Sequence, residues 1–313
     1  VQRRSMAILV DMTGSESRLD AIKTDFKRLG INDPVWLPGE DYDPASIELV
    51  LAWKPQVRDW SAYTGVKLVQ SWGAGVDHLL DAGFPADWPV ARFMGQSLKD
   101  RMVRYVCAQL SNWQLDMPRL VQAQNEKRWD WHDGRWGEQV LILGLGELGQ
   151  SVAEALVVQG YKVSGWSQSP KQLGGVESLT GKSGLNAGLA RADYLINLLP
   201  LTSATRALLG SELWARCERQ PVVMNVGRGA SLAEDDLIPA LEVGLLSGAI
   251  LDVFETEPLP PESPFWSHPN IWITPHIASI SDPSDVIRLS IDNLRQVRAG
   301  GPPRYPVDLS REY

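Results

Sequence analysis

The segment 139–156, QVLILGLGELGQSVAEAL, constrains the fold more than any other part of the chain. A short apolar run leads into glycines spaced G-x-G-x-x-G, and helical periodicity follows. With the apolar strand expected at 161–167, this is the β-α-β unit in which such a turn binds the pyrophosphate of a dinucleotide. Gly144 permits the tight turn, Gly146 the close approach of the pyrophosphate, and Gly149 close packing of helix and strand.

The helix after the glycine turn is expected over residues 150–159, with Gly160 at its end. The first N–H groups of such a helix and its dipole favour negative charge, so the phosphates are expected at its N-terminus. Taken alone, the segment leaves two alternatives open. One is a glycine-rich turn without a ligand, as in many α/β folds, and the other is a site for a methyl-donor nucleoside.

Apolar segments of strand length alternate with helical segments along the whole chain. Such alternation predicts parallel sheets with helices on their faces and a ligand crevice at the carboxyl ends of the strands. Since 313 residues suffice for two domains, the expected fold class is α/β with two Rossmann-like domains and doubly wound parallel sheets. The expected strands are 6–12, 47–53, 66–72, 90–95, 140–143, 161–167, 192–200, 221–227, 247–254 and 270–276. The expected helices are 17–30, 97–129 with a kink or break at Pro118, 150–159 and 281–300.

Charge and composition exclude several classes of protein. A net charge of −8 argues against binding to nucleic-acid backbones, which requires a basic surface. No stretch reaches the ~18 uninterrupted apolar residues of a membrane span, and the first apolar run is too short for a secretory signal. Two separated cysteines, Cys107 and Cys217, and four scattered histidines offer neither a disulfide pattern nor metal-ligand spacing. We therefore expect a cytoplasmic protein without a bound metal.

The end of the strand 161–167 predicts which dinucleotide is bound. An NAD site usually places Asp or Glu here, about 20 residues after the glycine turn, to hold the ribose 2′-hydroxyl. The sequence instead reads GWSQSPK, with no acid from Trp166 to Lys171. An acid would repel a 2′-phosphate, whereas hydroxyl groups and a lysine can bind it. The window favours NADP over NAD, although it contains no arginine.

A second glycine-containing segment, GKS at 181–183, resembles part of a phosphate-binding loop. That motif requires a glycine five residues before Gly181, where Val176 stands, and a preceding strand. Neither is evident in the sequence, so we expect an ordinary loop.

Three polar residues stand where expected strands give way to loops in the second half of the chain. Arg228 lies between two glycines in NVGRGA, Glu257 lies in DVFETEP, and His276 ends ITPH. Taken singly, Arg228 is typical of a solvated arginine and His276 of a structural histidine. The carboxyl ends of strands in one doubly wound sheet face one crevice, so we expect the three side chains to share a site.

These motifs, in this order, resemble the D-2-hydroxyacid dehydrogenases, and within that family the NADPH-preferring glyoxylate/hydroxypyruvate reductases of the A type. The resemblance extends from about Ala52 to the C-terminus and is weak before it. It is carried by the segments SWGAGVDHL, LILGLGELGQ, GWSQSPK, YLINLLPLTSAT, NVGRGASLAEDDLIPAL, GAILDVFETEPLPPESPFWSHPN, ITPHIAS and VDLSREY.

The resemblance implies NADPH-dependent reduction of a small 2-oxo acid, such as glyoxylate or hydroxypyruvate, to its 2-hydroxy acid. His276 would donate the proton, because the ordinary pKa of histidine, near 6.5, suits reversible transfer around neutral pH. Glu257 would pair with the imidazole and orient it, and Arg228 would bind the substrate carboxylate and carbonyl through its planar head. The backbone amides of Ala74 and Gly75 would complete the carboxylate site.

Further roles are implied by the resemblance. Trp53 would enclose a small substrate or else be a core residue, and Met102 would border the pocket, although a core position suits it better. Asp252 would receive the nicotinamide carboxamide. The cofactor-binding residues would be Gly144, Gly146, Glu147, Leu148, Gly149, Trp166, Ser167, Gln168, Ser169, Lys171, Leu199, Pro200, Thr202, Val226, Gly227, Arg228 and Asp252.

The resemblance also implies how the chain is divided. Residues 1–97 and 277–313 would form the substrate domain, and residues 98–276 would form the NAD(P)-binding Rossmann domain inserted between them. The helix 97–117 is the usual dimer contact of the family, so a homodimer is expected.

Two positions depart from the family pattern. Gln168 stands where arginine often binds the 2′-phosphate, and Asp282 replaces a basic residue expected near the pocket. These departures leave open an NAD-dependent dehydrogenase of larger 2-hydroxy acids. A non-catalytic protein that senses dinucleotides also stays open, because some relatives of this fold work as transcriptional co-repressors.

Overall fold

The computed structural model describes residues 7–312. Outside it lie Tyr313 and residues 1–6, which include Met6 at the start of the expected strand 6–12. The chain divides into two compact units: unit 1 comprises Val1–Leu98 and Ile280–Tyr313, and unit 2 comprises Lys99–Ser279. Unit 2 is therefore inserted in the sequence of unit 1, and the backbone passes between the units twice.

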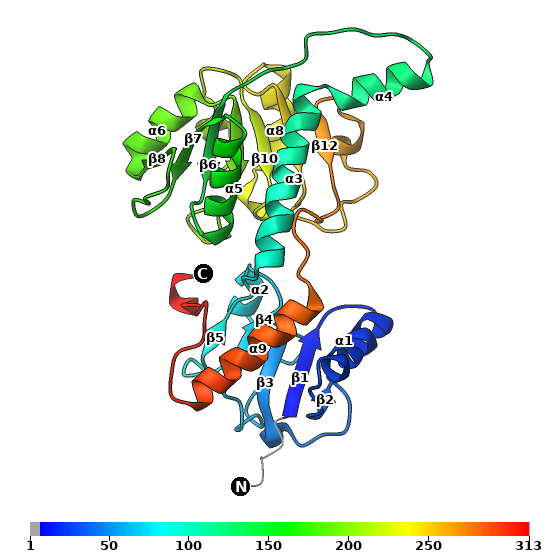
Figure 1. Ribbon diagram of the computed structural model, residues 1–313, viewed down its shortest axis with the longest axis vertical. Helices are drawn as coiled ribbons and strands as arrows, with labels where there is room; N and C mark the ends of the chain where they lie inside the picture. The colour runs from blue at the N-terminus through cyan, green and yellow to red at the C-terminus, as the bar shows by residue number, and fades with distance from the viewer. Residues whose placement is uncertain (1–6, 313) are drawn as a thin grey trace. The chain divides into compact units, whose positions relative to one another are not determined.

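Unit 1 is built on a parallel sheet of five strands in the order β2-β1-β3-β4-β5 (Figure 1). Its strands are β1 Ala7–Met12, β2 Val35–Trp36, β3 Ile47–Trp53, β4 Leu68–Ser71 and β5 Val90–Ala91. Its helices are α1 Glu16–Arg28, α2 Asp77–Leu80 and α9 Pro283–Arg298, with 3-10 turns at Pro44–Ser46 and Leu309–Arg311. Because α9 packs on α1, β3 and β4, both segments of the chain contribute to one core.

Unit 2 is built on a parallel sheet of seven strands in the order β12-β11-β10-β9-β6-β7-β8. The strands are β6 Gln139–Leu143, β7 Lys162–Trp166, β8 Val176–Leu179, β9 Tyr194–Asn197, β10 Val222–Asn225, β11 Gly248–Leu251 and β12 Ile271–Ile273. The helices are α3 Gln96–Gln114, which begins in unit 1, α4 Met117–Asn125, α5 Glu147–Val158, α6 Gly181–Arg191, α7 Ser211–Trp214 and α8 Glu234–Glu242. The 3-10 turns are Gly229–Ser231 and Pro264–Ser267. The strand order reverses between β6 and β9, which is where a doubly wound sheet opens a crevice for a ligand.

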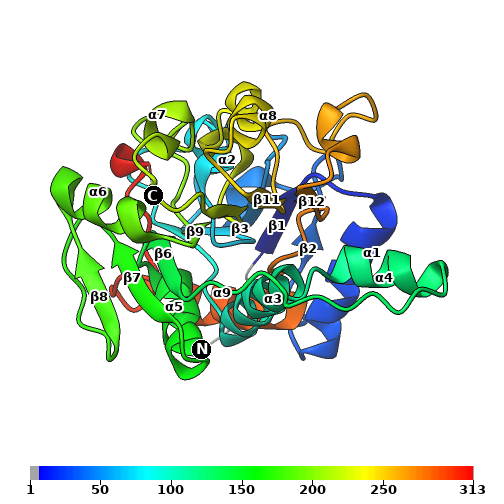
Figure 2. The same cartoon turned by 90° about the horizontal axis from the view of Figure 1, so that it is seen from above.

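The interior strand β6 is buried on both faces. Val140 and Ile142 pack with α3 and α5, whereas Leu141 and Leu143 pack with α6, α7 and α8. Side chains along a strand point alternately to opposite faces, so an uninterrupted apolar run fills both layers. Figure 2 shows α3 and α5 on one side of this sheet and α7 and α8 on the other. The doubly wound α/β fold predicted from the sequence is confirmed.

The main difference from the expected elements lies just after the predicted cofactor window. Val176–Leu179 forms the edge strand β8 and Gly181–Arg191 forms the helix α6, so the expectation of a loop at 181–183 is wrong. Only Leu179 is buried in β8, and its apolar pattern is correspondingly weak. Glycine lowers the helix propensity of α6, but Gly188 lets the helix pack closely on the sheet, because a Cβ there would lie within 3 Å of leucine side chains.

The expected helix 97–129 is two helices. α3 ends at Gln114, Asp116 adopts a left-handed conformation with φ of 50°, and α4 begins at Met117. Pro118 lies in the first turn of α4, where a missing N–H costs no helical hydrogen bond, so it marks a helix start. Within the described chain no helix, including α3 with its 19 residues, is long and apolar enough to cross a membrane.

Candidate active site

The glycine turn joins β6 to α5 and leaves the N-terminus of that helix open. Gly144 has a φ of +102°, which a residue with a side chain rarely adopts, and a Cβ there would lie 2.9 Å from the backbone of Leu198. A Cβ at Gly149 would lie 1.9 Å from the carbonyl oxygen of Gly144, so helix and strand are in direct contact. By contrast, nothing in the described chain lies within 4 Å of a Cβ at Gly146, which caps α5 without a side chain. The turn fits a pyrophosphate at the helix N-terminus.

A lysine from α3 lies beside this turn. Lys99 forms an ion pair with Glu147, the first residue of α5. A carboxylate suits the positive end of the helix dipole, but alone it would repel a pyrophosphate at the same place. Because Lys99 offsets that charge, Glu147 is compatible with a nearby anion. Leu148, the next residue, packs against the core layer of α3 and α5.

The predicted 2′-phosphate window begins at the end of β7 and runs beside β8 and α6. The indole N–H of Trp166 donates to the carbonyl oxygen of Gly181, at the start of α6, over 2.9 Å. The N–H of Ser167 donates to the carbonyl oxygen of Leu179, and its hydroxyl donates to that of Ser169. These bonds hold the backbone of the window next to the first turn of α6.

Two lysines lie around this window. Lys171, half-buried, has its backbone N–H bonded to Ser178 Oγ over 2.9 Å, and Lys182 is exposed in the first turn of α6. Among residues 7–312 neither lysine side chain forms an ion pair. Gln168, which precedes both lysines in the sequence, is exposed. The window therefore offers cations and hydroxyl groups, as a 2′-phosphate requires.

Two fully buried asparagines shape the loops at the carboxyl ends of β9 and β10. Asn197 Nδ2 donates to Asn225 Oδ1 over 3.0 Å, and Asn197 Oδ1 accepts the N–H of Leu199. Asn225 Oδ1 also accepts the N–H of Gly227, and its Nδ2 donates to the carbonyl oxygen of Arg228 over 3.0 Å. Both loops that carry predicted cofactor contacts are thereby tied to one another.

A threonine fixes the loop after β9, which contains the predicted cofactor contacts Pro200 and Thr202. Thr205 Oγ1 accepts the N–H of Thr202 over 2.8 Å and donates to the carbonyl oxygen of Pro200 over 2.6 Å. Val226 is buried in the core layer of α3 and α5, so only its backbone can take part in a cofactor site.

Two of the three predicted catalytic residues are hydrogen-bonded to each other. His276 Nδ1 lies 2.8 Å from Glu257 Oε2, and Glu257 Oε1 accepts the N–H of Phe254 over 3.1 Å. An ionised carboxylate only accepts hydrogen bonds, so Nδ1 carries a proton and Nε2 is left to exchange one with a substrate. Both side chains are partly exposed, so a substrate can reach the imidazole.

The loop of Arg228 adjoins the loop of Glu257. A Cβ at Gly229 would lie 1.9 Å from the backbone of Phe254, so the two loops are in direct contact there. Arg228 Nη1 donates to the carbonyl oxygen of Gly227 over 2.9 Å, which orients the guanidinium head. The arginine, the glutamate and the histidine therefore lie on the loops that follow the carboxyl ends of β10, β11 and β12.

Asp252, predicted to receive the nicotinamide carboxamide, is buried at the end of β11. Its Oδ1 accepts the hydroxyl of Thr274 and the N–H of Ile277, and its Oδ2 accepts the N–H of Ala278 over 2.8 Å. Burial raises the pKa of this carboxyl, while these hydrogen bonds and the nearby His276 lower it. A contact with the carboxamide remains a prediction for Asp252, whose carboxylate already binds the chain on either side of His276.

The predicted substrate residues of unit 1 lie together at the ends of β3 and β4. A Cβ at Gly73 would lie 2.7 Å from Trp53 Cζ3, so this tryptophan packs directly on the turn that contains Ala74 and Gly75. Ser71 Oγ donates to the carbonyl oxygen of Gly75 over 3.1 Å and shapes the same turn. Trp53 is half-buried, which leaves part of its ring available to a ligand.

Two residues discussed from the sequence have structural roles. Met102 is buried with Val106 and Leu110 in the core layer of α3 and α5, which confirms the core position favoured from the sequence. Asp282 is the N-cap of α9, and its Oδ1 accepts the N–H of Ser284 over 2.9 Å. An acid at this position is explained by helix capping.

Comparison with known proteins identifies the family of this chain. Residues 108–278, more than half of the chain, match the model of a family described as D-isomer specific 2-hydroxyacid dehydrogenase, NAD binding domain. The chain belongs to the D-isomer-specific 2-hydroxyacid dehydrogenase family. The family predicted from the motifs is thereby confirmed.

Among relatives in this dehydrogenase family, glyoxylate/hydroxypyruvate reductase A of Serratia proteamaculans is 39% identical over 287 residues, which are 89% of this chain and 90% of that protein. The protein of the same name from Yersinia enterocolitica is 36% identical, with 89% of this chain and 90% of that protein covered. The predicted likeness to the A type is also confirmed.

Solved structures of D-2-hydroxyacid dehydrogenases share the fold over nearly the whole chain. One from Xanthobacter autotrophicus Py2, in complex with NADPH and MES, has a TM-score of 0.90 at 34% identity and covers 99% of this chain and 100% of that one. An NADPH-dependent glyoxylate/hydroxypyruvate reductase from Sinorhizobium meliloti, in complex with NADP and sulfate, has a TM-score of 0.88 at 35% identity and covers 98% and 100%.

Several residues that shape this dehydrogenase site were not found from the sequence. Asn197 and Asn225 each end a strand, a position that was available as a signal in INLLP and MNVGRG. Lys99 gave no signal, because its position beside Glu147 depends on how α3 packs against α5. Lys182 was assigned to a loop without function, although it stands next to the 2′-phosphate window.

Proposed function

We propose that this dehydrogenase reduces a small 2-oxo acid, such as glyoxylate or hydroxypyruvate, to the 2-hydroxy acid with NADPH. The observation that carries the proposal is the 2.8 Å hydrogen bond between His276 and Glu257, on loops that adjoin the loop of Arg228. The reductase names of the relatives and the NADPH and NADP bound by the solved structures support it.

The reaction requires a hydride at C2 of the oxo acid and a proton at its carbonyl oxygen. NADPH supplies the hydride when bound. As the C2–H bond forms, the carbonyl π electrons move onto the oxygen, which takes the proton from His276 Nε2. Glu257 keeps the imidazole oriented through its hydrogen bond to Nδ1. Arg228 would hold the substrate carboxylate and draw charge onto the carbonyl oxygen.

We propose that unit 2 holds the cofactor and supplies Arg228, and that unit 1 supplies further donors for the substrate carboxylate. In unit 2 the glycine turn leaves space at Gly146, where a pyrophosphate would accept hydrogen bonds from the first N–H groups of α5. In unit 1 the backbone amides of Ala74 and Gly75 would bind the carboxylate, and Trp53 on the same turn would limit the size of the substrate. The predicted domain assignment, residues 1–97 with 277–313 and residues 98–276, follows this division.

The function is tested by following NADPH and NADH absorbance with the purified protein and a panel of 2-oxo acids of increasing size. We expect the highest kcat/KM with NADPH and a two- or three-carbon oxo acid. A preference for NADH with a bulky oxo acid would instead identify an NAD-linked dehydrogenase of larger acids. Binding of NADPH without turnover of any oxo acid would identify a dinucleotide sensor.

Replacing Ser167 with aspartate should shift cofactor preference toward NADH. The new carboxylate would stand at the end of β7, where it repels a 2′-phosphate and accepts a ribose 2′-hydroxyl. The ratio of kcat/KM for NADPH to that for NADH should fall about tenfold or more, which corresponds to ~1.4 kcal/mol per factor of ten.

The matched control for this shift is Ser267→Asp. Ser267 is an exposed serine in the 3-10 turn that leads to the amino end of β12, so its substitution should leave the ratio unchanged. An unchanged ratio in Ser167→Asp as well would contradict a 2′-phosphate site in this window.

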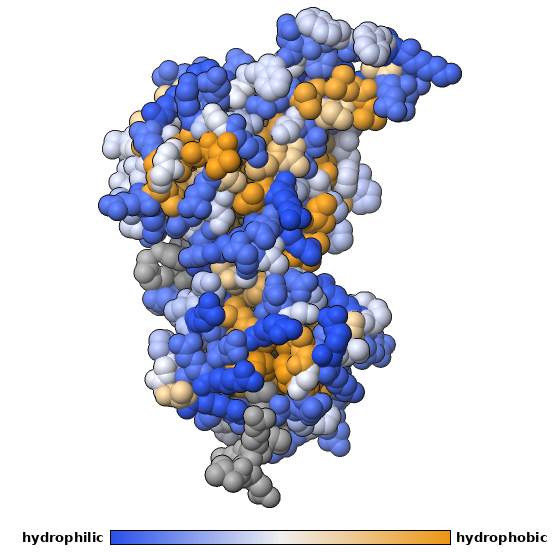
Figure 3. All heavy atoms as spheres, in the orientation of Figure 1, coloured by the Kyte–Doolittle hydropathy of each residue, from blue (hydrophilic) through white to orange (hydrophobic). Residues whose placement is uncertain are grey.

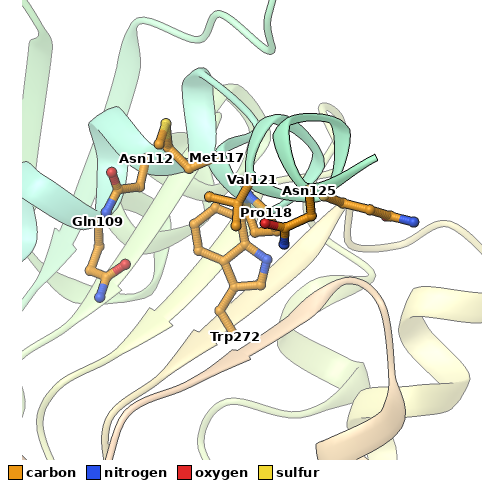
Figure 4. Close-up of a pocket in the computed structure, with 8 residues that line it drawn as sticks. Gln109, Asn112, Met117, Pro118, Val121, Asn125 and Trp272 are labelled. Carbon is orange, nitrogen blue, oxygen red and sulfur yellow. The ribbon is translucent and has the colours of Figure 1, made fainter. Parts of the chain in front are cut away.

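We also propose that two copies of the chain associate through the expected helix, α3, and through the arm that follows it, formed by α4 and residues 126–137. Three tryptophans of the arm are largely exposed: Trp129 by 97%, Trp131 by 75% and Trp136 by 71%. Residues of α3 and α4 line a groove of about 500 Å³ together with Trp272 (Figure 4). Apolar side chains gather over α4 (Figure 3). Large aromatic side chains and exposed apolar patches are typical of protein interfaces.

Replacing the three arm tryptophans with serine should convert a dimer into a monomer. The change removes the aromatic surface of the arm but no core residue, so the fold should be retained. Sedimentation equilibrium should give twice the chain mass for the unmodified protein and the chain mass for the triple variant. Trp266→Ser, at an exposed tryptophan of another loop, is the control and should remain dimeric. A monomeric unmodified protein would refute the proposal.

We place the protein in the cytoplasm. Cys107 and Cys217 are both free thiols, as in proteins of reducing compartments.

A further inference from the structure

The loop that carries His276 is held in an uncommon conformation. His276 has a φ of +54°, in the left-handed region that favours glycine. Its N–H donates to the carbonyl oxygen of Asp252 over 2.8 Å, and the N–H groups of Ile277 and Ala278 donate to the Asp252 carboxylate. One buried residue thus binds three successive backbone amides, and these bonds compensate for an unfavourable backbone conformation.

Two hydroxyl groups extend this arrangement away from the substrate side. Thr274 Oγ1 lies 2.6 Å from Asp252 Oδ1, and Tyr105 Oη lies 2.6 Å from Thr274 Oγ1. The carboxylate accepts, so the single hydroxyl proton of Thr274 is used on Asp252. Thr274 Oγ1 must then accept the proton of Tyr105, and the chain runs in one direction, from Tyr105 through Thr274 to Asp252.

Tyr105 is suited to be the fixed end of this chain. It lies on α3, half-buried, and burial raises the pKa of its phenol, so it remains a donor at neutral pH. Helix α3 starts in unit 1 at Gln96 and continues in unit 2, and unit 2 ends at Ser279, directly after the histidine loop. The hydroxyl chain thereby joins α3 to the last segment of unit 2.

We propose that Tyr105 and Thr274 are positioning residues whose hydroxyl chain fixes the Asp252 carboxylate, and through it the loop that presents His276 for proton transfer. The inference rests on the proposed role of His276 as proton donor. Neither hydroxyl contacts a reacting atom; each acts by limiting the positions that the imidazole can adopt. Loss of either should therefore lower kcat without weakening cofactor binding.

Thr274→Val keeps the shape of the side chain and removes the hydroxyl that bridges Tyr105 and Asp252. We expect kcat to fall about 10- to 100-fold, since a displacement of about 1 Å in a reacting group can cost about 100-fold. Tyr105→Phe removes one neutral hydrogen bond and should lower kcat about three- to tenfold. Thr274→Ser retains the hydroxyl and should restore kcat to within about twofold of the unmodified enzyme. The KM and Kd for NADPH should change little in all three.

The double variant Tyr105→Phe/Thr274→Val separates a chain from two independent structural effects. In a chain, Tyr105 acts only through Thr274, so the double variant should have the kcat of Thr274→Val alone. Multiplied losses would overturn the proposal, because effects of unconnected residues add in free energy. Tyr161→Phe is the control: this half-buried tyrosine of unit 2 donates to Gln114 Oε1 over 3.2 Å, and its loss should leave kcat unchanged.

Amide hydrogen exchange over residues 274–279 gives a readout besides activity. Exchange at Ile277 and Ala278 should be faster in Thr274→Val and Tyr105→Phe than in Thr274→Ser and Tyr161→Phe, at unchanged Tm. Unchanged exchange and unchanged kcat in both variants would overturn the inference. An unmodified protein that reduces no oxo acid would instead refute the proposed function, and the exchange rates would still decide whether the hydroxyl chain holds the loop.

Discussion

Replacing His276 with alanine should lower kcat for 2-oxo acid reduction about 100- to 10,000-fold, the usual contribution of a positioned general acid. Without the imidazole, the proton must come from water, and the paired Glu257 loses the group that it orients. The glycine turn and the window after β7 lie on other loops, so the Kd for NADPH should remain within about twofold, or ~0.4 kcal/mol. Single-turnover absorbance and a fluorescence titration with NADPH measure the two quantities separately.

The control for His276→Ala is His268→Ala. His268 is a half-buried histidine at the end of the 3-10 turn before β12, and its Nδ1 accepts the N–H of Asn270. Its loss should leave kcat unchanged. Turnover that survives in His276→Ala, with Tm and NADPH binding intact, would show that another group delivers the proton.

The grouping of the three predicted catalytic residues could be anticipated from the sequence, because a parallel sheet brings distant segments together at the carboxyl ends of its strands. Arg228, Glu257 and His276 are separated by 29 and 19 residues in the sequence, and each follows the carboxyl end of a strand of one sheet. The strand order alone therefore brings their loops together. The glycine turn was predictable for a related reason, since its φ and its close contacts admit no side chain at Gly144 or Gly149.

What could not be predicted depends on packing between elements. β8 was missed because a short edge strand with one buried residue carries little apolar signal, and α6 was missed with it. Tyr105 has the spacing of any core-facing aromatic residue on a helix, and only the fold brings its hydroxyl to Thr274. Expected strands such as 192–200 were too long, because apolar residues continue past Asn197 into the loop that the buried asparagines shape.

Arg228→Lys should lower kcat/KM for the oxo acid about 100- to 1,000-fold, the effect of losing one charged donor at a reacting carbonyl. The backbone of Arg228 is fixed by Asn225 and by the close contact of Gly229, so a shorter-reaching ammonium cannot be carried to the substrate by movement of the loop. The guanidinium is a planar fork of N–H donors, one of which bonds Gly227 through Nη1, whereas lysine offers one point charge for both tasks.

The loss in Arg228→Lys should be expressed in both kcat and the KM for the oxo acid, with the KM for NADPH unchanged, because the arginine would grip the substrate before transfer and the developing charge during it. Steady-state kinetics with each substrate varied in turn make this distinction. Arg206→Lys is the control, since that exposed arginine faces Glu255 at 3.8 Å and such a pair contributes about 0–1 kcal/mol. A kcat/KM within about threefold of the unmodified enzyme, ~0.7 kcal/mol, would mean that positive charge suffices at this position and that the planar head is not required.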